Sequence, residues 1–305
     1  MSILVVGSVA LDSVETPYGK VDNAVGGSAT FFSASGSYFS PIHLVAVVGN
    51  DYPMNEIEFL KDRRVDFEGL QIEDGETFKW AGRYHYELNQ RETIYTHLNV
   101  FQNFKPIIPD HYKNSDYVFL GNIAPELQYS VLDQVSKPKL VALDTMNFWI
   151  EGSQKALRKV LERVDVFILN DSEARQLANQ PNLIKASREI LKMGPTALVI
   201  KKGEYGASLV TKETNFTVPA YPVEEVIDPT GAGDTFAGGF LGYIAKTGDL
   251  RDESLKRAVV YGSVMASFCV QDFSITALKS LTQDEIKTRF NEFKSFSDFE
   301  TQEPS

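Results

Sequence analysis

Residues 228–240 read DPTGAGDTFAGGF and place four glycines and two aspartates in thirteen positions. Apolar residues recur at helical spacing from Asp234 onward, so the glycines lie at the N-terminus of a predicted helix. Unpaired backbone N–H groups and the positive end of the helix dipole make such a terminus a binding site for anions. Glycine also lets the backbone approach a phosphate closely. The stretch therefore predicts an anion site at Gly231, Ala232 and Gly233, with a carboxylate beside it.

Asp234 stands where a carboxylate could act as a base. It could accept the proton of an attacking hydroxyl while the neighbouring N–H groups hold a transferring phosphoryl group, because phosphoryl transfer depends mainly on positioning and charge stabilisation. An unperturbed aspartate is ionised at neutral pH, so this task requires placement more than a shifted pKa. The structural alternative is that Asp234 only caps the helix, a common role for aspartate. The residues alone leave both interpretations open.

Two familiar phosphate-binding motifs are absent from the sequence. No G-x-x-x-x-G-K-[ST] occurs, which excludes a P-loop protein, and no G-x-G-x-x-G follows the first predicted strand, which disfavours a dinucleotide enzyme. The four histidines are scattered, and the single cysteine, Cys269, lies in an apolar run, where it is expected to be a buried packing residue. Neither residue type predicts a metal site.

These chemical groups must be positioned by alternating strands and helices. Short, nearly continuous hydrophobic runs predict buried strands of a parallel sheet at 3–6, 44–48, 117–121, 140–144, 166–170 and 197–201. Helical patterns occur at 153–164, 172–179, 185–193, 252–270 and 282–297, and the end at 299–305 predicts a frayed tail. The alternation predicts an α/β fold with right-handed crossovers, in which ligands bind beyond the carboxyl ends of the strands.

The segment 77–98 breaks this alternation because its polar and apolar residues follow a period of two. One predicted face carries Phe78, Trp80, Gly82, Tyr84, Tyr86 and Leu88. The polar step ELNQRE leads into a second alternating run, so we expect an antiparallel hairpin, which is only marginally stable alone. We predict a small β lid formed by residues 12–25 and 76–100. Its aromatic face is expected in the core or in a homodimer interface between lids, in preference to a ligand contact.

The composition is that of a soluble globular protein, with 305 residues of which 43% are hydrophobic and 23% charged. The formal net charge is −11 and no basic stripe is present, so a nucleic-acid partner is not expected. No apolar run is long enough to span a bilayer, and the N-terminal residues lack the positive region of a secretory signal. One cysteine cannot form an internal disulfide, so we expect a reducing, cytoplasmic setting.

The stretch DPTGAGDTFAGGF resembles the C-terminal signature of the ribokinase-like, or PfkB-type, carbohydrate kinases. Further matches follow in the expected order: GSVALD at 7–12, GGSATFFSASGSYF at 26–39, VGNDYPMNEIEFLKDRRVDFEGL at 48–70, NDSE at 170–173 and KKGEYGA at 201–207. The resemblance implies one ribokinase-like domain over residues 1–305. It would be a three-layer α/β/α sandwich with a mostly parallel central sheet and a small β-sheet lid.

The resemblance also implies an ATP-dependent kinase that transfers the γ-phosphoryl group to a hydroxyl, chiefly a hydroxymethyl, of a small molecule. A sugar, sugar derivative or nucleoside is the expected acceptor, and a hexose, an inositol and a hydroxymethylpyrimidine stay open. Asp234 would be the general base, and Gly231, Ala232 and Gly233 would form the anion hole with the Asp234 amide. A non-catalytic nucleotide- or sugar-binding sensor on the same fold is the alternative, although a sensor has no need for the base.

The acceptor side of the implied site begins at the first strand. By the resemblance, Asp12 would bind two adjacent hydroxyls, and Gly26 and Gly27 would let the backbone approach the acceptor. Asn147 is a further candidate for acceptor binding. The chain departs from ribokinases five positions after Gly26, where those proteins commonly carry asparagine and this one has Phe31. The resemblance therefore does not point to ribose.

The nucleotide side is implied by a different set of residues, namely Asn170, Glu173, Lys201, Gly203 and Thr230. Glu173 would organise Mg²⁺ through water, since Mg²⁺ keeps several waters and binds largely through substrate oxygens. The spacing of Asn170 and Glu173 is also that of a capping box, which is the structural alternative. Lys201 could equally be a solvated lysine. Asp228 matches a position that binds a monovalent cation in some relatives, so K⁺ is a further candidate beside ATP and Mg²⁺.

Overall fold

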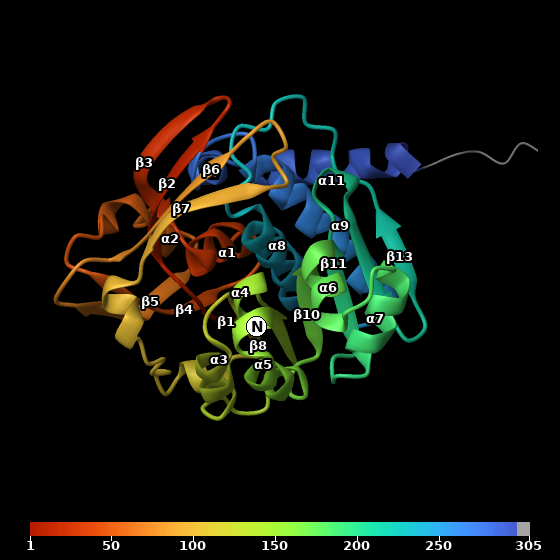
Figure 1. The fold of residues 1–305 in the computed structure, drawn as a ribbon, viewed down its shortest axis with the longest axis horizontal. Coiled ribbons are helices and arrows are strands. Elements are labelled where there is room, and N and C mark those ends of the chain that lie inside the picture. The colour runs from red at the N-terminus through yellow and green to blue at the C-terminus, as the bar shows by residue number, and fades with distance from the viewer. Residues whose placement is uncertain (298–305) are drawn as a thin grey trace, which may run out of the picture.

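The computed structural model describes residues 1–297, and its centre is a nine-stranded sheet (Figure 1). The strand order is β13-β12-β11-β10-β9-β8-β1-β4-β5, with parallel neighbours from β5 to β11 and antiparallel pairing at β12 and β13. The strands are β1 (Ile3–Val6), β4 (Ile42–Gly49), β5 (Val65–Glu73), β8 (Tyr117–Leu120), β9 (Leu140–Asp144), β10 (Val166–Asn170), β11 (Ala197–Lys201), β12 (Ala207–Thr211) and β13 (Asn215–Val218). The predicted frayed tail at 299–305 lies outside the described residues.

The six predicted strands form the middle of this sheet, and the strands that the sequence pattern does not reveal lie at or next to its edges. An edge strand has one open side and mixes polar with apolar residues, so it lacks the continuous hydrophobic run of a central strand. Strand β5 shows this mixture, since buried and exposed residues alternate irregularly along it. The predicted mostly parallel sheet is confirmed.

Helices cover both faces of the sheet, as a three-layer sandwich requires (Figure 1). Along β1, Ile3 and Val5 pack against one helical layer, and Leu4 and Val6 pack against the other. The first layer contains α1 (Ser28–Gly36), α2 (Phe59–Asp62), α8 (Ala232–Thr247), α9 (Asp252–Cys269), α10 (Thr276–Lys279) and α11 (Gln283–Ser297). The second contains α3 (Pro125–Leu132), α4 (Asn147–Gly152), α5 (Gln154–Leu161), α6 (Asp171–Ala178) and α7 (Leu183–Leu191). Short 3₁₀ helices are η1 (Met54–Glu56), η2 (Asn99–Asn103), η3 (Tyr112–Asn114) and η4 (Gly203–Tyr205).

Among residues 1–297, no helix is both long and apolar enough to cross a membrane.

Helix α8 is packed unusually closely between α1 and α9, because glycines face both neighbours. A Cβ at Gly238 would lie 2.4 Å from the Phe32 carbonyl oxygen of α1, and one at Gly239 would lie 2.8 Å from the Tyr261 carbonyl oxygen of α9. Larger side chains would force the three helices apart. This packing holds the N-terminus of α8 at a fixed place beyond the carboxyl ends of the central strands.

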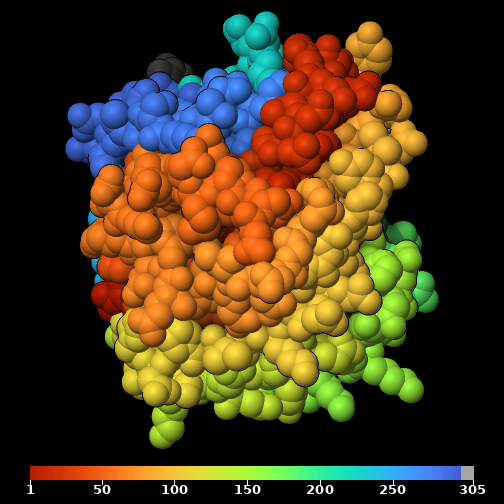
Figure 2. Space-filling model, turned by 90° about the vertical axis from the view of Figure 1, so that its left-hand side faces the viewer, coloured from red at the N-terminus to blue at the C-terminus, as the bar shows by residue number. Residues whose placement is uncertain are grey.

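A separate four-stranded sheet, in the order β3-β2-β6-β7, forms the predicted β lid (Figure 1). Its strands are β2 (Ala10–Thr16), β3 (Gly19–Gly26), β6 (Phe78–Tyr84) and β7 (Arg91–His97). The two hairpins lie side by side although they are far apart in the sequence (Figure 2), and β2 pairs with β6 in parallel. The predicted aromatic face is shorter than its pattern indicates: Tyr86 lies in the hairpin loop with 97% of its surface exposed. Its loop position removes it from both the core and the strand pairing.

Candidate active site

The glycine-rich stretch forms the N-terminus of α8, as predicted from sequence. Gly231 is the N-cap with a φ of 73°, and a Cβ there would lie 2.3 Å from the Phe31 ring, so only glycine fits on both grounds. Asp234 is the third residue of the helix. In this first turn, the N–H groups of Gly233 and Asp234 have no helical carbonyl to bond, which leaves donors for an anion.

Lys201 lies directly beside this helix terminus. It ends β11, and a Cβ at Gly233 would be only 2.8 Å from the Lys201 Nζ atom. The ammonium is 3.3 Å from the Asp144 Oδ2 atom at the end of β9, and both side chains are largely buried. The alternative of a solvated lysine at position 201 is therefore wrong: the structure brings a paired cation next to the predicted anion site.

Burial dominates the electrostatics of the acidic groups here. The pKa of Asp234 is raised to about 7, mainly by desolvation and also by the Asp144 charge, while the charges of Lys201 and Arg91 act to lower it. Desolvation likewise raises the pKa of Glu173 to about 7, against the lowering effect of the Lys201 charge. The sequence-based expectation of an unperturbed carboxylate at position 234 is thus wrong. Asp234 is half-buried, and the sequence does not reveal how far the fold shields its carboxylate from water.

Asn170 and Glu173 form the capping box that their spacing allows. The Asn170 Oδ1 atom accepts a hydrogen bond from the Glu173 N–H at 2.8 Å, and the Asn170 N–H donates to Glu173 Oε2 at 2.7 Å. The box places the buried Glu173 carboxylate within electrostatic reach of Lys201 and Asp144. Both interpretations of this pair are therefore compatible with one geometry, because the capping carboxylate also lies within electrostatic reach of Lys201.

Asp12, on strand β2 of the lid sheet, lies near the same cluster of charges. Its Oδ2 atom accepts a hydrogen bond from the Gly27 N–H at 3.3 Å, and a Cβ at Gly26 would lie 1.9 Å from that oxygen. Burial raises the pKa of Asp12 to about 7, with a further contribution from the charges of Asp228 and Asp234. The structure thus brings together Asp12, Gly26 and Gly27 and places them within electrostatic reach of Asp234.

The remaining predicted residues lie around the rim of this cluster. Asn147 begins α4, and its Nδ2 atom donates to Gln176 Oε1 on α6 at 2.5 Å, so its recorded contact is with the helix that carries Glu173. Gly203 begins η4 beneath the lid hairpin loop, where a Cβ would meet the Asn89 Oδ1 atom at 2.0 Å. The lid therefore reaches across to the predicted nucleotide side.

Asp228 and Thr230 connect the anion site to the lid. The Asp228 carboxylate is buried and accepts hydrogen bonds from the N–H groups of Thr230 at 2.8 Å and Ser274 at 3.5 Å. The Thr230 Oγ1 atom donates to the Tyr84 hydroxyl oxygen on β6 at 3.2 Å. Position 84 pairs with Arg91 on β7, which explains why the Arg91 charge lowers the pKa of both Asp12 and Asp234. Sequence reasoning missed Arg91, because a lid arginine in a polar hairpin carries no motif.

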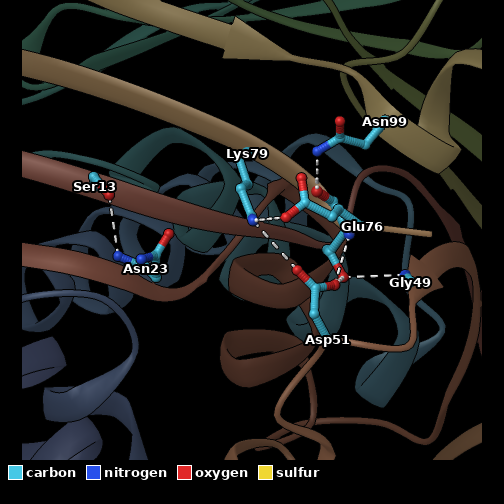
Figure 3. Close-up of polar contacts among 8 residues, drawn as sticks. Ser13, Asn23, Gly49, Asp51, Glu76, Lys79 and Asn99 are labelled. Atoms are coloured by element: carbon cyan, nitrogen blue, oxygen red, sulfur yellow. Dashed lines mark hydrogen bonds and ion pairs between the residues drawn. The ribbon is translucent and has the colours of Figure 1, made fainter.

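The base of the β6–β7 hairpin is fixed to the end of β4 by a polar network that the sequence does not reveal (Figure 3). The Asp51 Oδ1 atom accepts hydrogen bonds from the Thr77 N–H at 2.7 Å and the Thr77 hydroxyl at 2.6 Å. The Gly49 N–H donates to Thr77 Oγ1 at 3.0 Å, and Asn99 Nδ2 donates to the Thr77 carbonyl at 2.8 Å. Lys79 adds an ion pair with Asp51 at 3.4 Å. Both ends of the hairpin are thus held at one place, which we call the lid anchor.

A bulge shapes the other lid hairpin beside Asp12. The β2–β3 register shifts between Asp12 and Val14, and the Asn23 N–H donates to the Ser13 Oγ atom at 3.0 Å (Figure 3). Asn23 has a φ of 51°, a left-handed conformation that asparagine tolerates. Bulges often re-aim a neighbouring side chain. Here the Ser13–Asn23 bond stabilises the bulge next to the predicted acceptor-binding carboxylate.

This arrangement defines a class of protein. Asp12 and Asp234 lie within electrostatic reach of each other, and Asp234 stands near a lysine at a glycine-rich helix terminus, an arrangement that suits phosphoryl transfer to a hydroxyl. The comparison with family models agrees: residues 2–281 match the pfkB family carbohydrate kinase model, and the chain belongs to this family. The predicted ribokinase-like resemblance and the kinase class are thereby confirmed.

Individual relatives are nucleoside and sugar kinases. The chain is 31% identical over 248 residues to a cytidine kinase of Thermococcus kodakarensis, covering 79% of this chain and 87% of that protein. It is 24% identical over 229 residues to a nucleoside kinase of Methanocaldococcus jannaschii, covering 75% and 72%. Among solved structures, the crystal structure of the M. jannaschii nucleoside kinase has a TM-score of 0.75 at 22% identity and covers 95% of this chain and 98% of that one. A putative Escherichia coli ribokinase II has a TM-score of 0.79 at 20% identity, with 95% and 99% covered. The structural neighbours confirm the ribokinase fold.

Proposed function

We propose that this protein is an ATP-dependent nucleoside kinase that transfers the γ-phosphoryl group to the hydroxymethyl oxygen of a pyrimidine ribonucleoside such as cytidine. The observation that carries the proposal is a pair of carboxylates within electrostatic reach of each other, Asp12 on the lid sheet and Asp234 at the glycine-rich helix terminus. One suits a hydroxyl-binding role and the other suits a base beside an anion site. The similarity to a cytidine kinase, at 31% identity, supports the nucleoside as acceptor.

In the proposed reaction, the ionised Asp234 carboxylate accepts the proton of the acceptor hydroxyl as its oxygen attacks the γ-phosphorus. The bond from that phosphorus to the bridging oxygen of ATP breaks, and ADP leaves. The N–H groups of Gly233 and Asp234 and the Lys201 ammonium stabilise the negative charge on the transferring group. The raised pKa of Asp234 makes its carboxylate a stronger base than an exposed aspartate. The carboxylate is then fully ionised only above neutral pH.

The residues present fit ATP and Mg²⁺. The positive φ at Gly231 and the closeness of Lys201 to Gly233 make a cradle that a side chain would fill, which suits a phosphate group. Among the described residues, no three acidic, histidine or cysteine side chains form a metal cage, so Mg²⁺ would be held mainly by phosphate oxygens and water. We propose Glu173 as the residue that orders this water. When bound, Mg²⁺ neutralises phosphate charge.

We also propose roles for residues at the edge of the site. Thr230, Gly203 and Asn170 border the nucleotide side, and Asp228 is proposed to hold a monovalent cation. A K⁺-for-Na⁺ exchange in the assay tests the cation: activation by K⁺ that Asp228→Asn abolishes supports it, and equal rates in both salts contradict it. Asn147 is bonded to Gln176, so we propose that it acts only through α6.

The choice of nucleoside over ribose is also supported by Phe31. Its side chain is 2% exposed and its ring packs against Gly231 in the anion loop. The position where ribokinases commonly carry a polar contact is therefore filled by an aromatic ring that offers no hydrogen bond. A free ribose would lack this polar contact, which lowers the preference expected for ribose.

The test is coupled ATP consumption with cytidine, uridine, adenosine, inosine, ribose and fructose as acceptors. We expect the highest kcat/KM with a pyrimidine ribonucleoside and a value for ribose lower by about a hundredfold, because several interactions of the order of 1 kcal/mol each would be lost. Asp234→Asn is the control for contaminating kinases. A preference for ribose or fructose would overturn the nucleoside assignment, and ATP binding without phosphorylation of any acceptor would favour the sensor alternative.

A further inference from the structure

Two buried hydroxyl groups near Asp12 take no part in the hydrogen bonds described so far. Thr30 is 2% exposed and Tyr52 is 6% exposed, yet neither the Thr30 Oγ1 atom nor the Tyr52 hydroxyl has a hydrogen-bond partner among the residues that the structure describes. Buried polar groups are normally paired, and exceptions need an explanation such as a missing ligand. A binding site is one place where such groups are expected, because the ligand supplies the partner.

Both residues are held close to Asp12. Thr30 lies in the first turn of α1, three residues after Gly27, whose N–H group bonds the Asp12 carboxylate. Tyr52 follows the end of β4, and its N–H donates to the Gly49 carbonyl at 3.3 Å. Burial raises the pKa of the Tyr52 phenol, the neighbouring Thr30 hydroxyl lowers it, and the Asp12 charge raises it. The three polar groups therefore converge from a helix, a loop and a lid strand.

Their chemistry is complementary. An ionised Asp12 can only accept hydrogen bonds, so it satisfies the protons of two neighbouring hydroxyls but not their oxygens. The Thr30 and Tyr52 hydroxyls can donate to those oxygens. A vicinal diol presents two O–H donors and two oxygen acceptors, and the set of one carboxylate and two hydroxyls matches both kinds of group.

The lid anchor ties Tyr52 to the lid. Asp51, the preceding residue, accepts both hydrogen bonds from Thr77 at the base of the β6–β7 hairpin (Figure 3). The backbone that carries the Tyr52 ring is therefore fixed by the same contact that fixes the lid. A tyrosine on a free loop would lack this support.

We propose that Tyr52 and Thr30 are specificity-determining residues that donate hydrogen bonds to the ribose hydroxyl oxygens of the acceptor while Asp12 accepts their protons. This inference rests on the proposed function. It goes further by assigning recognition of the 2′,3′-diol, and so the preference for a ribonucleoside over a deoxynucleoside, to two residues outside the glycine-rich signatures. Each hydroxyl acts only on acceptors that carry its partner oxygen.

The test compares Tyr52→Phe and Thr30→Val with wild type, using cytidine, 2′-deoxycytidine and 3′-deoxycytidine as acceptors. We expect each variant to raise KM for cytidine by about three- to tenfold with kcat changed less than about twofold, the effect of one hydrogen bond to a neutral group. With the deoxy analogue that lacks the partner oxygen, variant and wild type should have equal KM values. A residue that only supports the fold would weaken all three acceptors alike.

Tyr112→Phe is the matched control. The Tyr112 hydroxyl is also buried and without a hydrogen bond in the described structure. Its ring, however, stacks on His43, at the opposite end of β4 from Tyr52. The Tyr112→Phe variant should leave all three KM values unchanged. Thermal unfolding checks that every variant is folded.

The outcomes separate the two proposals. Suppose that wild type phosphorylates cytidine, but Tyr52→Phe and Thr30→Val leave KM unchanged or weaken all three acceptors equally. This result would overturn the inference and leave the proposed function in place. Wild type that phosphorylates sugars but no nucleoside would overturn the proposed function.

Discussion

Lys201 and Asp144 form a largely buried ion pair beside the N-terminus of α8, with 3.3 Å between the Lys201 Nζ and Asp144 Oδ2 atoms. Their strands, β11 and β9, lie on either side of β10, so the pair spans one strand at the carboxyl edge of the sheet. A buried ammonium is stable only when it is paired. Asp144 therefore keeps Lys201 charged beside Gly233, where the proposed function requires positive charge.

We expect Lys201→Met to lower kcat by about a hundred- to a thousandfold, because it removes the fixed cation that would stabilise the transferring phosphoryl group. Steady-state kinetics with the best acceptor measures the effect. The matched control is Lys202→Met at the adjacent position, whose side chain lies outside the described ion pair, and it should retain activity. A Lys201→Met enzyme within about threefold of wild type would contradict a role for this ammonium in the reaction.

The activity should depend on pH near neutrality. A base must be deprotonated, and burial raises the pKa of Asp234 to about 7, so kcat/KM should fall as the pH is lowered through about 7. The charge of Asp144 raises this pKa, so Asp144→Asn should move the acid limb of the profile to lower pH. A pH–rate profile of both enzymes between pH 5 and 9 checks this. An acid limb near pH 4 in wild type would show that Asp234 is far better solvated than the structure indicates.

The same raised pKa means that the ionised Asp234 lowers the free energy of unfolding. Its pKa is about 7 in the folded protein and near the ordinary aspartate value when unfolded, so the folded state binds more protons between about pH 4 and 7. The contribution of this group to stability therefore decreases as the pH rises through that window and stays low above it. Asp234→Asn should be more stable than wild type by about 1–3 kcal/mol at pH 8, and by less at pH 5.

Urea denaturation at the two pH values measures this difference. Asp249→Asn is the control with the opposite expectation, because hydrogen bonds from Arg251 lower the pKa of Asp249, and its replacement should give no gain at pH 8. An Asp234→Asn protein less stable than wild type at pH 8 would mean that the carboxylate is a structural cap after all.

Sequence reasoning was most successful where one local rule determines the outcome. The central strands were predictable because strands covered on both faces must be hydrophobic throughout, and the α8 terminus was predictable because a tight, anion-facing turn needs glycine at Gly231. The edge strands β5 and β13 were not, since edge positions tolerate mixed polarity. Local sequence patterns therefore predict the parts of the fold that are determined by residues adjacent in the chain.

Contacts between distant segments could not be predicted in this way. Lys201 was a candidate for the nucleotide side, but its ion pair could not be predicted because nothing near it in the sequence shows Asp144, which lies two strands away. The raised pKa of Asp234 depends on burial and on the charge of Asp144, and the Tyr52 and Thr30 hydroxyls come close together only after β4 and α1 pack together. These features depend on tertiary packing, and one sequence contains no direct record of it.

The lid anchor should control how tightly the site excludes water. Thr77→Val keeps the shape of the side chain but removes the hydroxyl that donates to Asp51 at 2.6 Å and accepts from Gly49 at 3.0 Å. The loss of a buried hydrogen bond of about 1 kcal/mol would raise the open fraction of the lid by about fivefold. Because an open lid admits water to the phosphoryl group, the variant should hydrolyse more ATP per acceptor phosphorylated and should have a higher KM for the acceptor. Parallel measurement of ADP and phosphorylated acceptor gives this ratio, with Thr96→Val on the exposed part of β7 as the control. A Thr77→Val enzyme that still forms one ADP per product, with an unchanged KM, would show that the anchor only supports folding.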